Sequence, residues 1–419
     1  MKRKVFLVVG LCLLGVLALV VGIPVGKRAY QEYREHLPWR YISLRKLPED
    51  NGVPRLFINT NTGLMVQNKK HYTEAQYALY VDGTEVQGGD IQVKGHGNTT
   101  WTSPKKSYIL RFREPEGMLG LPEARRWILL NPFFDKTMLR NDLAYHLGRT
   151  IYTNMKWVPH LVDVEVVMNG KYLGVYQLAE RIDIASGRVD IPSGGVVMEF
   201  SKDDGTVIRT PHTRMLCKDP DKKIPEKDLE TWTEAVLDFD QRLYSPDFGN
   251  YQEVFDLSSF IDWYLVQEFA KNNDAKYGGS TYWYYDPRDK KLHFGPIWDF
   301  DIGFGNEDLT YDTRKPEGFH VNQFVYAGRL LEDPACRSLL KSRWNSTKGC
   351  LWEEIHTYLP EHSAYLEQAR TWNYKAWDYM DIEVWPQAYA GYTYEEQYDY
   401  LLHWLETRWQ WLDEAINAL

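Results

Sequence analysis

The stretch NNDAKYGGSTYWYYDPRDKKLHFGPIWDFDIGFGN, residues 272–306, holds two groups of acidic and amide residues separated by a predicted β-hairpin. Its strands are a Thr-, Tyr- and Trp-rich run at 280–285 and a run at 292–294, with Asp-Pro-Arg-Asp as turn chemistry between them. A hairpin brings its two ends together. We therefore expect Asp274, which precedes the first strand, to lie close to Asp299, which follows the second.

Carboxylates gathered at the open end of a hairpin repel one another unless a cation offsets their charge. Asp299 and Asp301 are two residues apart, so on an extended backbone both side chains point the same way, as shared ligation of Mg²⁺ requires. That arrangement leaves Asp274 to accept a proton or to hold a nucleophile. The alternative interpretation is a pair of Asx-turns with an ordinary surface carboxylate, since Asp and Asn favour turns for their own reasons.

The length and composition limit the possible domain organisation and the possible partners of the chain. A chain of 419 residues exceeds one average domain, which favours two lobes or two domains. The 16 Trp and 29 Tyr suit either a large buried core or a surface that stacks against sugars or bases. The net charge of -9 argues against a general nucleic-acid binder, because phosphate contacts need clustered Lys and Arg, and it is compatible with a basic partner.

An apolar run at residues 5–26 is flanked by basic residues at both ends and is long enough to span a bilayer. No small-x-small cleavage site follows it, so the sequence predicts a retained signal anchor over residues 1–28 rather than a removed signal peptide. The denser basic cluster lies on the N-terminal side, which favours a single-pass membrane protein whose body is extracytoplasmic. Residues 29–50 are charged and aromatic and are predicted to form a juxtamembrane stalk.

Three cysteines lie beyond the predicted anchor, so no disulfide framework is expected to hold the fold. They are Cys217, Cys336 and Cys350, and a single bridge between the last two is left open by the sequence.

The remaining chain, residues 51–419, is predicted to change character near residue 200. Residues 51–200 contain several short strands, with Asn169-Gly170 as the strongest hairpin signal, and one helix at 135–150 capped by Asp135. Residues 201–228 are polar and are predicted to be a loop at the boundary between lobes. Helices are predicted beyond that loop, including 229–243 and 258–271, so the expected fold is α+β with a β-rich lobe, a helical lobe at about 201–419 and a cleft between them.

A second candidate for chemistry is the segment VKGHGNTTW at residues 93–101, a Gly-x-Gly between strands. Glycines let backbone N–H groups approach a phosphate closely, and a Lys at the start of the next strand supplies a point charge for it. The alternative is a Gly-rich hairpin beside solvated lysines. His96 fits a loop residue better than a metal ligand, because no second His lies at ligand spacing. The candidate phosphate-binding residues are Gly95, Gly97, Asn98, Lys105 and Lys106.

Two further residues carry charges that a nucleotide site could use. Glu180 ends an apolar strand near the predicted lobe boundary, where an adenine edge could be read, although such a residue is often simply ion-paired. Arg140 lies on the predicted helix at 135–150 and either pairs with an internal carboxylate or faces the cleft as a cation for phosphate.

The order of these parts is that of protein-kinase-like enzymes: a Gly-rich turn, a strand Lys, a linker, a helix ending in an Asp-bearing loop, a hairpin, then Asp-Phe-x-x-Gly. The sequence also resembles the spore coat protein H (CotH) kinase family over about residues 91–306. The segments that carry the resemblance are GHGNTTWTSPKKSYILRF, DKTMLRNDLA, NGKYLGVYQLAERI, the loop at 269–274 and FGPIWDFDIGFGN.

The resemblance implies an atypical, two-lobed kinase-like fold that uses ATP and a divalent ion, here Mg²⁺. Two departures from the family pattern are visible: His96 stands where Arg is common, and Gly279 stands where kinases have Asn five residues after the catalytic Asp. The second departure leaves the second metal ligand open. The implied roles are Asp274 as the catalytic Asp, Asp299 as the principal metal ligand with Asp301 assisting, Lys105 or Lys106 on the ATP phosphates, and Glu180 at the nucleotide-binding linker.

The expected reaction is transfer of the ATP γ-phosphoryl group to Ser or Thr of a surface or spore coat protein that is basic or rich in Ser and Thr. One alternative is AMP transfer by the same cleft with the nucleotide reversed. Another is a non-catalytic anchored scaffold for adhesion or coat assembly, with the aromatic residues at 389–411 as a partner or glycan surface. Helical spacing of those aromatics fits a helix core better.

Overall fold

The computed structural model describes residues 40–218, 224–307, 311–384, 386–387 and 391–419. The predicted signal anchor at 1–28, and the stalk as far as residue 39, lie outside the described residues. None of the helices that the structure does describe combines the length and the apolar character needed to cross a bilayer.

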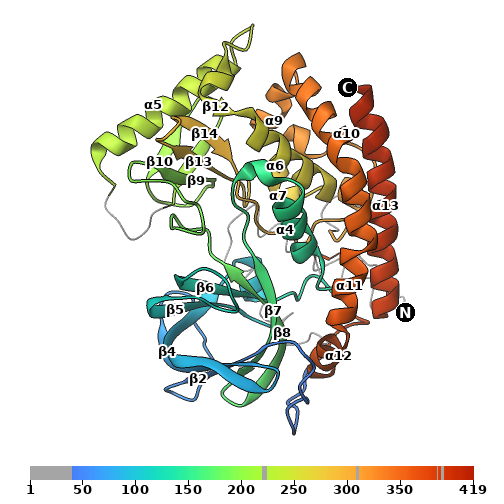
Figure 1. Cartoon of the computed structure of the whole chain (residues 1–419). Helices are drawn as coiled ribbons and strands as arrows, with labels where there is room; N and C mark the ends of the chain where they lie inside the picture. Colours follow the sequence, from blue (N-terminus) through green and yellow to red (C-terminus); the bar gives the residue numbers. More distant parts are fainter. Residues whose placement is uncertain (1–39, 219–223, 308–310, 385, 388–390) are drawn as a thin grey trace, which may run out of the picture.

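The fold is mixed α+β, and its first half forms a closed seven-stranded barrel in the order β2-β3-β4-β5-β6-β8-β7 (Figure 1). All neighbours pair antiparallel except β2 and β7, which close the barrel in parallel. The hairpin predicted at Asn169-Gly170 is confirmed, because it joins β7 to β8. The strands are β2 (Arg55–Thr60), β3 (Thr73–Val81), β4 (Thr84–His96), β5 (Ser107–Glu116), β6 (Ala124–Leu130), β7 (Leu161–Met168) and β8 (Lys171–Glu180).

Alternating side chains on the barrel strands separate an apolar interior from the outer face. Val93, Leu110 and Trp127 are fully buried inside the barrel. The residues one position away along β4, β5 and β6 therefore point outward, and several of them are basic.

A second sheet of six strands follows in the order β10-β11-β9-β13-β14-β12. The predicted hairpin after Asp274 is confirmed as β13 and β14, which pair antiparallel. The prediction of a loop at 201–228 was wrong in part, because two strands of only three and four residues lie within it, too short to show an alternating pattern. The strands are β9 (Val196–Phe200), β10 (Val207–Arg209), β11 (Arg214–Cys217), β12 (Phe255–Asp256), β13 (Tyr282–Asp286) and β14 (Lys291–Phe294).

Helices surround this second sheet, and the long helices α10 and α13 lie side by side along one edge of the molecule (Figure 1). The helix predicted from Asp135 begins instead at Arg140, whose backbone N–H is accepted by the Asp135 carboxylate at 2.8 Å. The helices are α3 (Thr99–Thr102), α4 (Arg140–Thr150), α5 (Glu226–Leu243), α6 (Leu257–Ala270), α7 (Asn273–Lys276), α8 (Tyr311–Arg314), α9 (Val325–Leu330), α10 (Pro334–His356), α11 (Tyr358–Tyr365), α12 (Glu367–Ala376) and α13 (Tyr394–Ala418).

Short elements complete the fold, and β1 pairs with β15 near the barrel. They are β1 (Arg40–Tyr41), β15 (Trp377–Asp378) and the 3-10 turns η1 (Thr153–Met155), η2 (Tyr251–Glu253) and η3 (Val321–Gln323).

Cys336 and Cys350 are both free and lie on the same helix, α10. At about 1.5 Å per residue their fourteen-residue separation is about 21 Å along the axis, beyond the reach of a disulfide. The bridge that the sequence left open is therefore absent.

Helix α6 is buried on nearly all sides and delivers the chain into Asn272-Asn273-Asp274. Near its end, the buried Glu268 carboxylate forms an ion pair of 2.6 Å with Arg408 of α13. The same carboxylate accepts the backbone N–H groups of His320 and Val321 at 2.7 Å. One buried charge pair thus holds the end of α6 against the start of η3.

We expect Arg408→Met to lower the free energy of unfolding by about 3–5 kcal/mol, because it leaves Glu268 buried without its cation. Urea unfolding followed by circular dichroism measures the change. Arg242→Met, which breaks only solvent-exposed pairs with Asp238 and Glu253, is the control and should change stability little. Equal losses in the two variants would contradict the role given to the buried pair.

Candidate active site

Asn272 joins the two acidic segments at the end of α6. Its side-chain oxygen accepts the backbone N–H of Asp274 at 3.2 Å, and its side-chain nitrogen donates to the backbone oxygen of Asp299 at 3.0 Å. The expectation that Asp274 and Asp299 are spatial neighbours is therefore confirmed, and a single amide side chain holds both segments.

Ser280 connects the same two carboxylates through its side chain. Its hydroxyl donates to Asp274 Oδ2 at 3.4 Å and also hydrogen-bonds the Asp299 carboxyl. Because Ser280 follows Asp274 by six residues and precedes β13, the start of the hairpin itself lies between the two acidic groups.

The side chains of Asp299 and Asp301 lie together, but not because the backbone is extended, as the sequence predicted. Asp299 has a left-handed backbone with φ of +68°, so the segment is a turn and not an extended strand. Side chains of α4 hold it, since Tyr145 Oη accepts the N–H of Asp299 at 3.2 Å and Asn141 Oδ1 accepts the N–H of Phe300 at 2.7 Å. The Asp299 and Asp301 side chains hydrogen-bond each other.

Burial raises the pKa of all three carboxyls, and neighbouring negative charge adds to the shift at Asp299 and Asp301. Burial is the first cause in each case; it raises the pKa of Asp299 to about 7, with the Asp274 charge adding to the effect. The pKa of Asp301 lies well above its ordinary value because of burial and the charges of Asp299, Asp135 and Asp274. Burial also raises the pKa of Asp274. Within the described part of the chain, the charges that act most strongly on Asp299 and Asp301 are those of other carboxyls, so a hard divalent cation with oxygen ligands fits this group.

Glu307 is a fourth carboxyl at this site that the sequence analysis missed. It is 1% exposed, and burial together with the Asp274 charge raises its pKa to about 7. Its Oε1 accepts from Asn273 at 2.7 Å, whereas its buried Oε2 has no hydrogen-bond partner in the described structure. The Gly-Phe-Gly-Asn-Glu run after Asp301 could have drawn attention to it.

A cationic face lies on the outside of the barrel, formed by Lys94, Arg111, Arg126 and Arg181. Arg111 and Arg126 are directly opposite each other on β5 and β6, a like-charge pairing that costs stability. After burial, the charges of Arg181, Arg126 and Arg111 lower the pKa of Lys94. Both Arg111 and Lys94 lie over the ring of Tyr72, at 3.8 and 4.8 Å from its centroid. Asp183 already pairs with Arg181 at 2.7 Å, and its charge also acts on Arg126. The excess of positive charge on this face still favours an anionic ligand.

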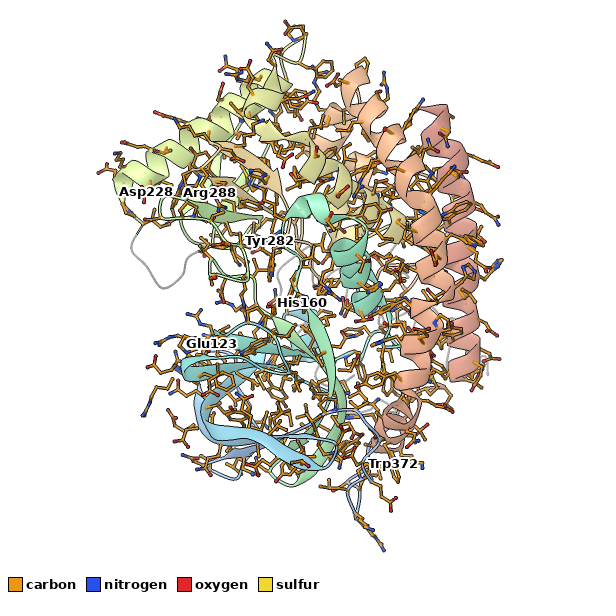
Figure 2. All side chains as sticks on the ribbon, in the orientation of Figure 1. Glu123, His160, Asp228, Tyr282, Arg288 and Trp372 are labelled. Carbon is orange, nitrogen blue, oxygen red and sulfur yellow. The ribbon has the colours of Figure 1, made fainter. Side chains whose placement is uncertain are left out.

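A short chain of contacts lies on the second sheet near the acidic group. Tyr282, at the start of β13 and on the side of the sheet toward the barrel in Figure 2, donates its hydroxyl to Glu199 at 3.1 Å, and Glu199 holds Lys218 at 2.6 Å. The Asp299 charge helps to raise the pKa of Tyr282, and the Lys218 charge, after burial and the charges of Arg181, Lys69 and Lys94, helps to lower the pKa of His96 to about 4. His96 is therefore neutral near pH 7.

Lys105 is a predicted phosphate-binding residue, but its side chain lies inside the protein. It is 1% exposed, and its ammonium donates to the backbone oxygen of Val175 and, at 2.7 Å, to Asn373 of α12, with the Tyr176 ring 4.6 Å away. Burial lowers its pKa well below the ordinary value. An ammonium engaged inside the protein is not available to a phosphate, so its position supports a structural role for Lys105.

The neighbouring glycine-rich segment is tied to its own loop. Lys106 donates to the backbone oxygens of Trp101 and Ser103, both at 2.6 Å, and Lys69 holds the Gly97 oxygen and the Asn98 side chain. A Cβ on Gly95 would lie 2.1 Å from the Trp101 ring, and Gly97 has φ of +84°, so glycine is required at both positions. Whether this loop binds phosphate stays a prediction.

Arg140 and Glu180 both have internal partners. Arg140 is fully buried and pairs with Asp135 at 2.6 Å, which is the structural alternative named from the sequence. Glu180 is also fully buried, and its Oε2 accepts the backbone N–H of His160 at 2.9 Å and lies 2.8 Å from His160 Nδ1. Neither arrangement supports direct contact with a nucleotide through these side chains.

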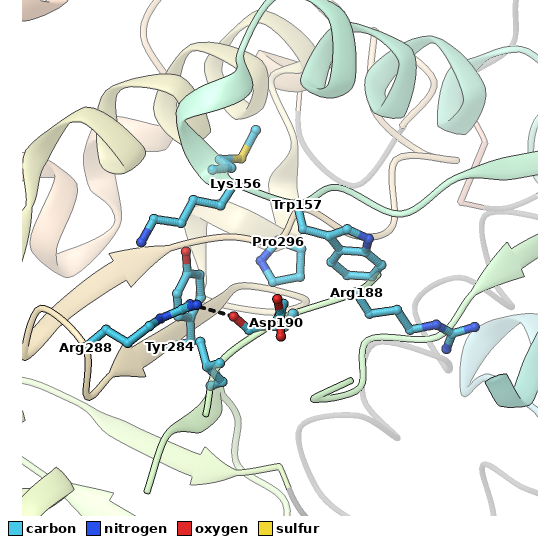
Figure 3. Close-up of a pocket in the computed structure, with 10 residues that line it drawn as sticks. Lys156, Trp157, Arg188, Asp190, Tyr284, Arg288 and Pro296 are labelled. Carbon is cyan, nitrogen blue, oxygen red and sulfur yellow. Dashed lines mark hydrogen bonds between the residues drawn. The ribbon is translucent and has the colours of Figure 1, made fainter. Parts of the chain in front are cut away.

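A second group of possible metal ligands lies on the hairpin turn, beside a cavity of about 70 Å³ shown in Figure 3. Asp286, Asp289 and His293 offer ligand atoms within 4.8 Å of one another. Protein cations already neutralise these carboxylates. Arg288 pairs with Asp286 at 2.7 Å, and the Lys156 ammonium lies 3.7 Å from Asp286 and 3.7 Å from Asp289. The carboxylates at Asp299 and Asp301 are the better candidate for an added cation.

A comparison with protein-family models matches residues 91–412 to the CotH kinase protein family, which is most of the chain. The chain belongs to this family. Membership supports a kinase-like phosphotransferase and is consistent with the acidic group and the cationic face described above. A comparison with curated proteins found no match.

We expect Asp299→Asn to change how stability depends on pH in the metal-free protein. The folded-state pKa of Asp299 is raised from 3.8 to about 7, so the folded protein binds the extra proton between these values and loses stability as the pH rises through that window. The variant should lose less stability over the same pH range. Asparagine tolerates the left-handed backbone at this position. Melting temperatures from pH 4 to 8 provide the measurement.

The exposed carboxyl variant Asp204→Asn is the control for this comparison and should follow the parent protein. Saturating Mg²⁺ should stabilise the parent above pH 7 and have less effect on Asp299→Asn. Parallel pH profiles for parent and Asp299→Asn would contradict the crowding of the acidic group.

Proposed function

We propose that this CotH-family chain is an ATP- and Mg²⁺-dependent phosphotransferase with two kinase-like lobes, the barrel and the helix-covered second sheet. The observation that carries the proposal is the acidic group at the end of α6, in a chain whose barrel also carries a cationic face. A triphosphate with a divalent cation has the charge pattern that complements both groups.

The acidic group would hold the metal through Asp299 and Asp301, whose carboxylate oxygens are suitable ligands. When bound, Mg²⁺ supplies positive charge to the phosphate oxygens. Lys94, Arg111 and Arg126 would bind the phosphates from the barrel in place of the predicted Lys105, because they lie on its outer face and Lys105 is buried.

Asp274 would act on the acceptor hydroxyl. In the proposed step the hydroxyl oxygen forms a bond to the γ-phosphorus, the bond from that phosphorus to the bridging oxygen breaks, and the electron pair leaves with ADP. Asp274 orients the hydroxyl and accepts its proton, a role that its raised pKa favours over that of an ordinary exposed carboxylate.

We also propose the acceptor to be Ser or Thr of a coat or surface protein, met on the extracytoplasmic side of a membrane to which residues 1–28 attach the chain. The net charge of -9 supports a basic protein partner.

Asp274→Asn should reduce turnover by several orders of magnitude and leave the fold intact, because the amide cannot accept the proton. Purified protein, ATP, Mg²⁺ and a Ser/Thr-rich basic test protein are incubated, and mass spectrometry reads the added group. Parent-level phosphorylation by the variant would refute the role of Asp274, and addition of AMP would refute phosphoryl transfer as the reaction.

Arg126→Gln should raise the Kd for ATP at least several-fold, and the loss should be larger at low than at high salt, because one phosphate contact is removed. Arg125→Gln is the matched control. Arg125 is the adjacent residue on β6, and its pair with Glu114 is exposed. Calorimetry with ATP and Mg²⁺ measures both variants, and equal affinities would exclude the cationic face as the phosphate site.

A further inference from the structure

Two members of the cationic face share one aromatic side chain, that of Tyr72, which immediately precedes β3. Its ring centroid lies 3.8 Å from Arg111 Cζ and 4.8 Å from Lys94 Nζ. The first pair of β3 and β4 is Thr73 opposite Val93, so one step further along the register Tyr72 comes opposite Lys94. Tyr72 therefore lies on the outer face of the barrel, among the cations.

The ring of Tyr72 offsets part of the repulsion between these cations. The face of an aromatic ring is negative, so it attracts an ammonium or a guanidinium group and favours particular positions for each. Arg111 is held on a second side by Gln92, whose Oε1 accepts from Arg111 Nε at 2.7 Å and also from Nη2. With one edge on Gln92 and one face on Tyr72, the guanidinium group has a fixed orientation before any anion is bound.

The segment that carries this ring also holds the glycine-rich turn. The backbone oxygen of Asn68 accepts the N–H of Gly95 at 2.8 Å, and the Lys69 ammonium donates to the Gly97 oxygen. The aromatic side chain follows three residues after this lysine. Residues 68–72 thus connect the turn to the cationic face, and they precede the part of the chain that the family model matches. The family pattern therefore does not account for them.

We propose that Tyr72 is a positioning residue for the nucleotide phosphates, because its ring holds Lys94 and Arg111 in the arrangement that binds them. The inference rests on the proposed function and specifies how its phosphate site is kept in shape. Replacing the tyrosine by leucine removes no charge from the face, so it should change the placement of the cations and not their number.

Calorimetric titration of the full chain with ATP and Mg²⁺, at low and at high salt, tests this role. Tyr72→Leu should raise the Kd for ATP about threefold or more, because the attraction of the ring for both cations is lost. The factor should be similar at the two salt concentrations, because every charge on the face remains. Tyr72→Phe keeps the ring and should bind ATP as the parent does. Circular dichroism checks that each variant is folded.

Tyr80→Leu is the matched control, since Tyr80 belongs to the same strand but packs edge to face against Phe57 and donates its hydroxyl to Glu85 at 2.9 Å. This control should keep the parent affinity for ATP.

A double-variant comparison separates positioning from a general loss of structure. If the ring acts through the guanidinium group, Arg111→Gln should weaken ATP binding less in the Tyr72→Leu protein than in the parent. Parent affinity in Tyr72→Leu, an equal loss in Tyr72→Phe, or fully additive effects of the two substitutions would overturn the role of Tyr72 while leaving the proposed function intact. Failure of the parent itself to bind ATP would instead overturn the proposed function, and this inference with it.

Discussion

The mutual repulsion of crowded, largely buried carboxylates, of which Asp301 is the most enclosed, is the constraint around which this structure is built. Asp274, Asp299 and Asp301 approach one another at the end of α6, where burial and neighbouring negative charge raise the pKa of Asp299 and Asp301. The fold overcomes that repulsion with neutral groups: Asn272 fastens both acidic segments and Ser280 lies between them. Among the described residues, the charges that act most strongly on Asp299 and Asp301 are those of other carboxyls, so the group is suited to a cation from solution.

On the outer face of the barrel the charges that repel one another are positive. Lys94, Arg111 and Arg126 are neighbours on adjacent strands, and Arg111 faces Arg126 directly, a like-charge pairing that costs stability. The acidic group lies at the end of α6 and in the turn after β14, whereas the cationic face belongs to the barrel. A ligand that carries both negative phosphates and a divalent cation relieves both repulsions at once, which is the physical basis for assigning a nucleotide to this CotH-family protein.

Local chemistry made much of this architecture predictable. Turn residues at Asn169-Gly170 and between β13 and β14 are enough to predict two hairpins, and the second of them predicts that Asp274 lies beside Asp299. The features that local patterns do not reveal depend on distant residues. Lys105 is buried because α12, more than two hundred residues later, covers it with Asn373, and no local pattern contains that information. Alternation on β5 and β6 could have shown that Arg111 and Arg126 both lie on the outer face of the barrel, although not that they pair. The position of Ser280 depends on a left-handed backbone that sequence patterns do not specify.

The most direct test of the central claim is anomalous diffraction from a crystal soaked with Mn²⁺ and a non-hydrolysable ATP analogue. The account predicts a strong Mn²⁺ peak between the carboxylates of Asp299 and Asp301, with the phosphates extending toward Lys94, Arg111 and Arg126. A Mn²⁺ peak only at Asp286, Asp289 and His293, with the acidic group at the end of α6 empty and the cationic face free of phosphate, would contradict it.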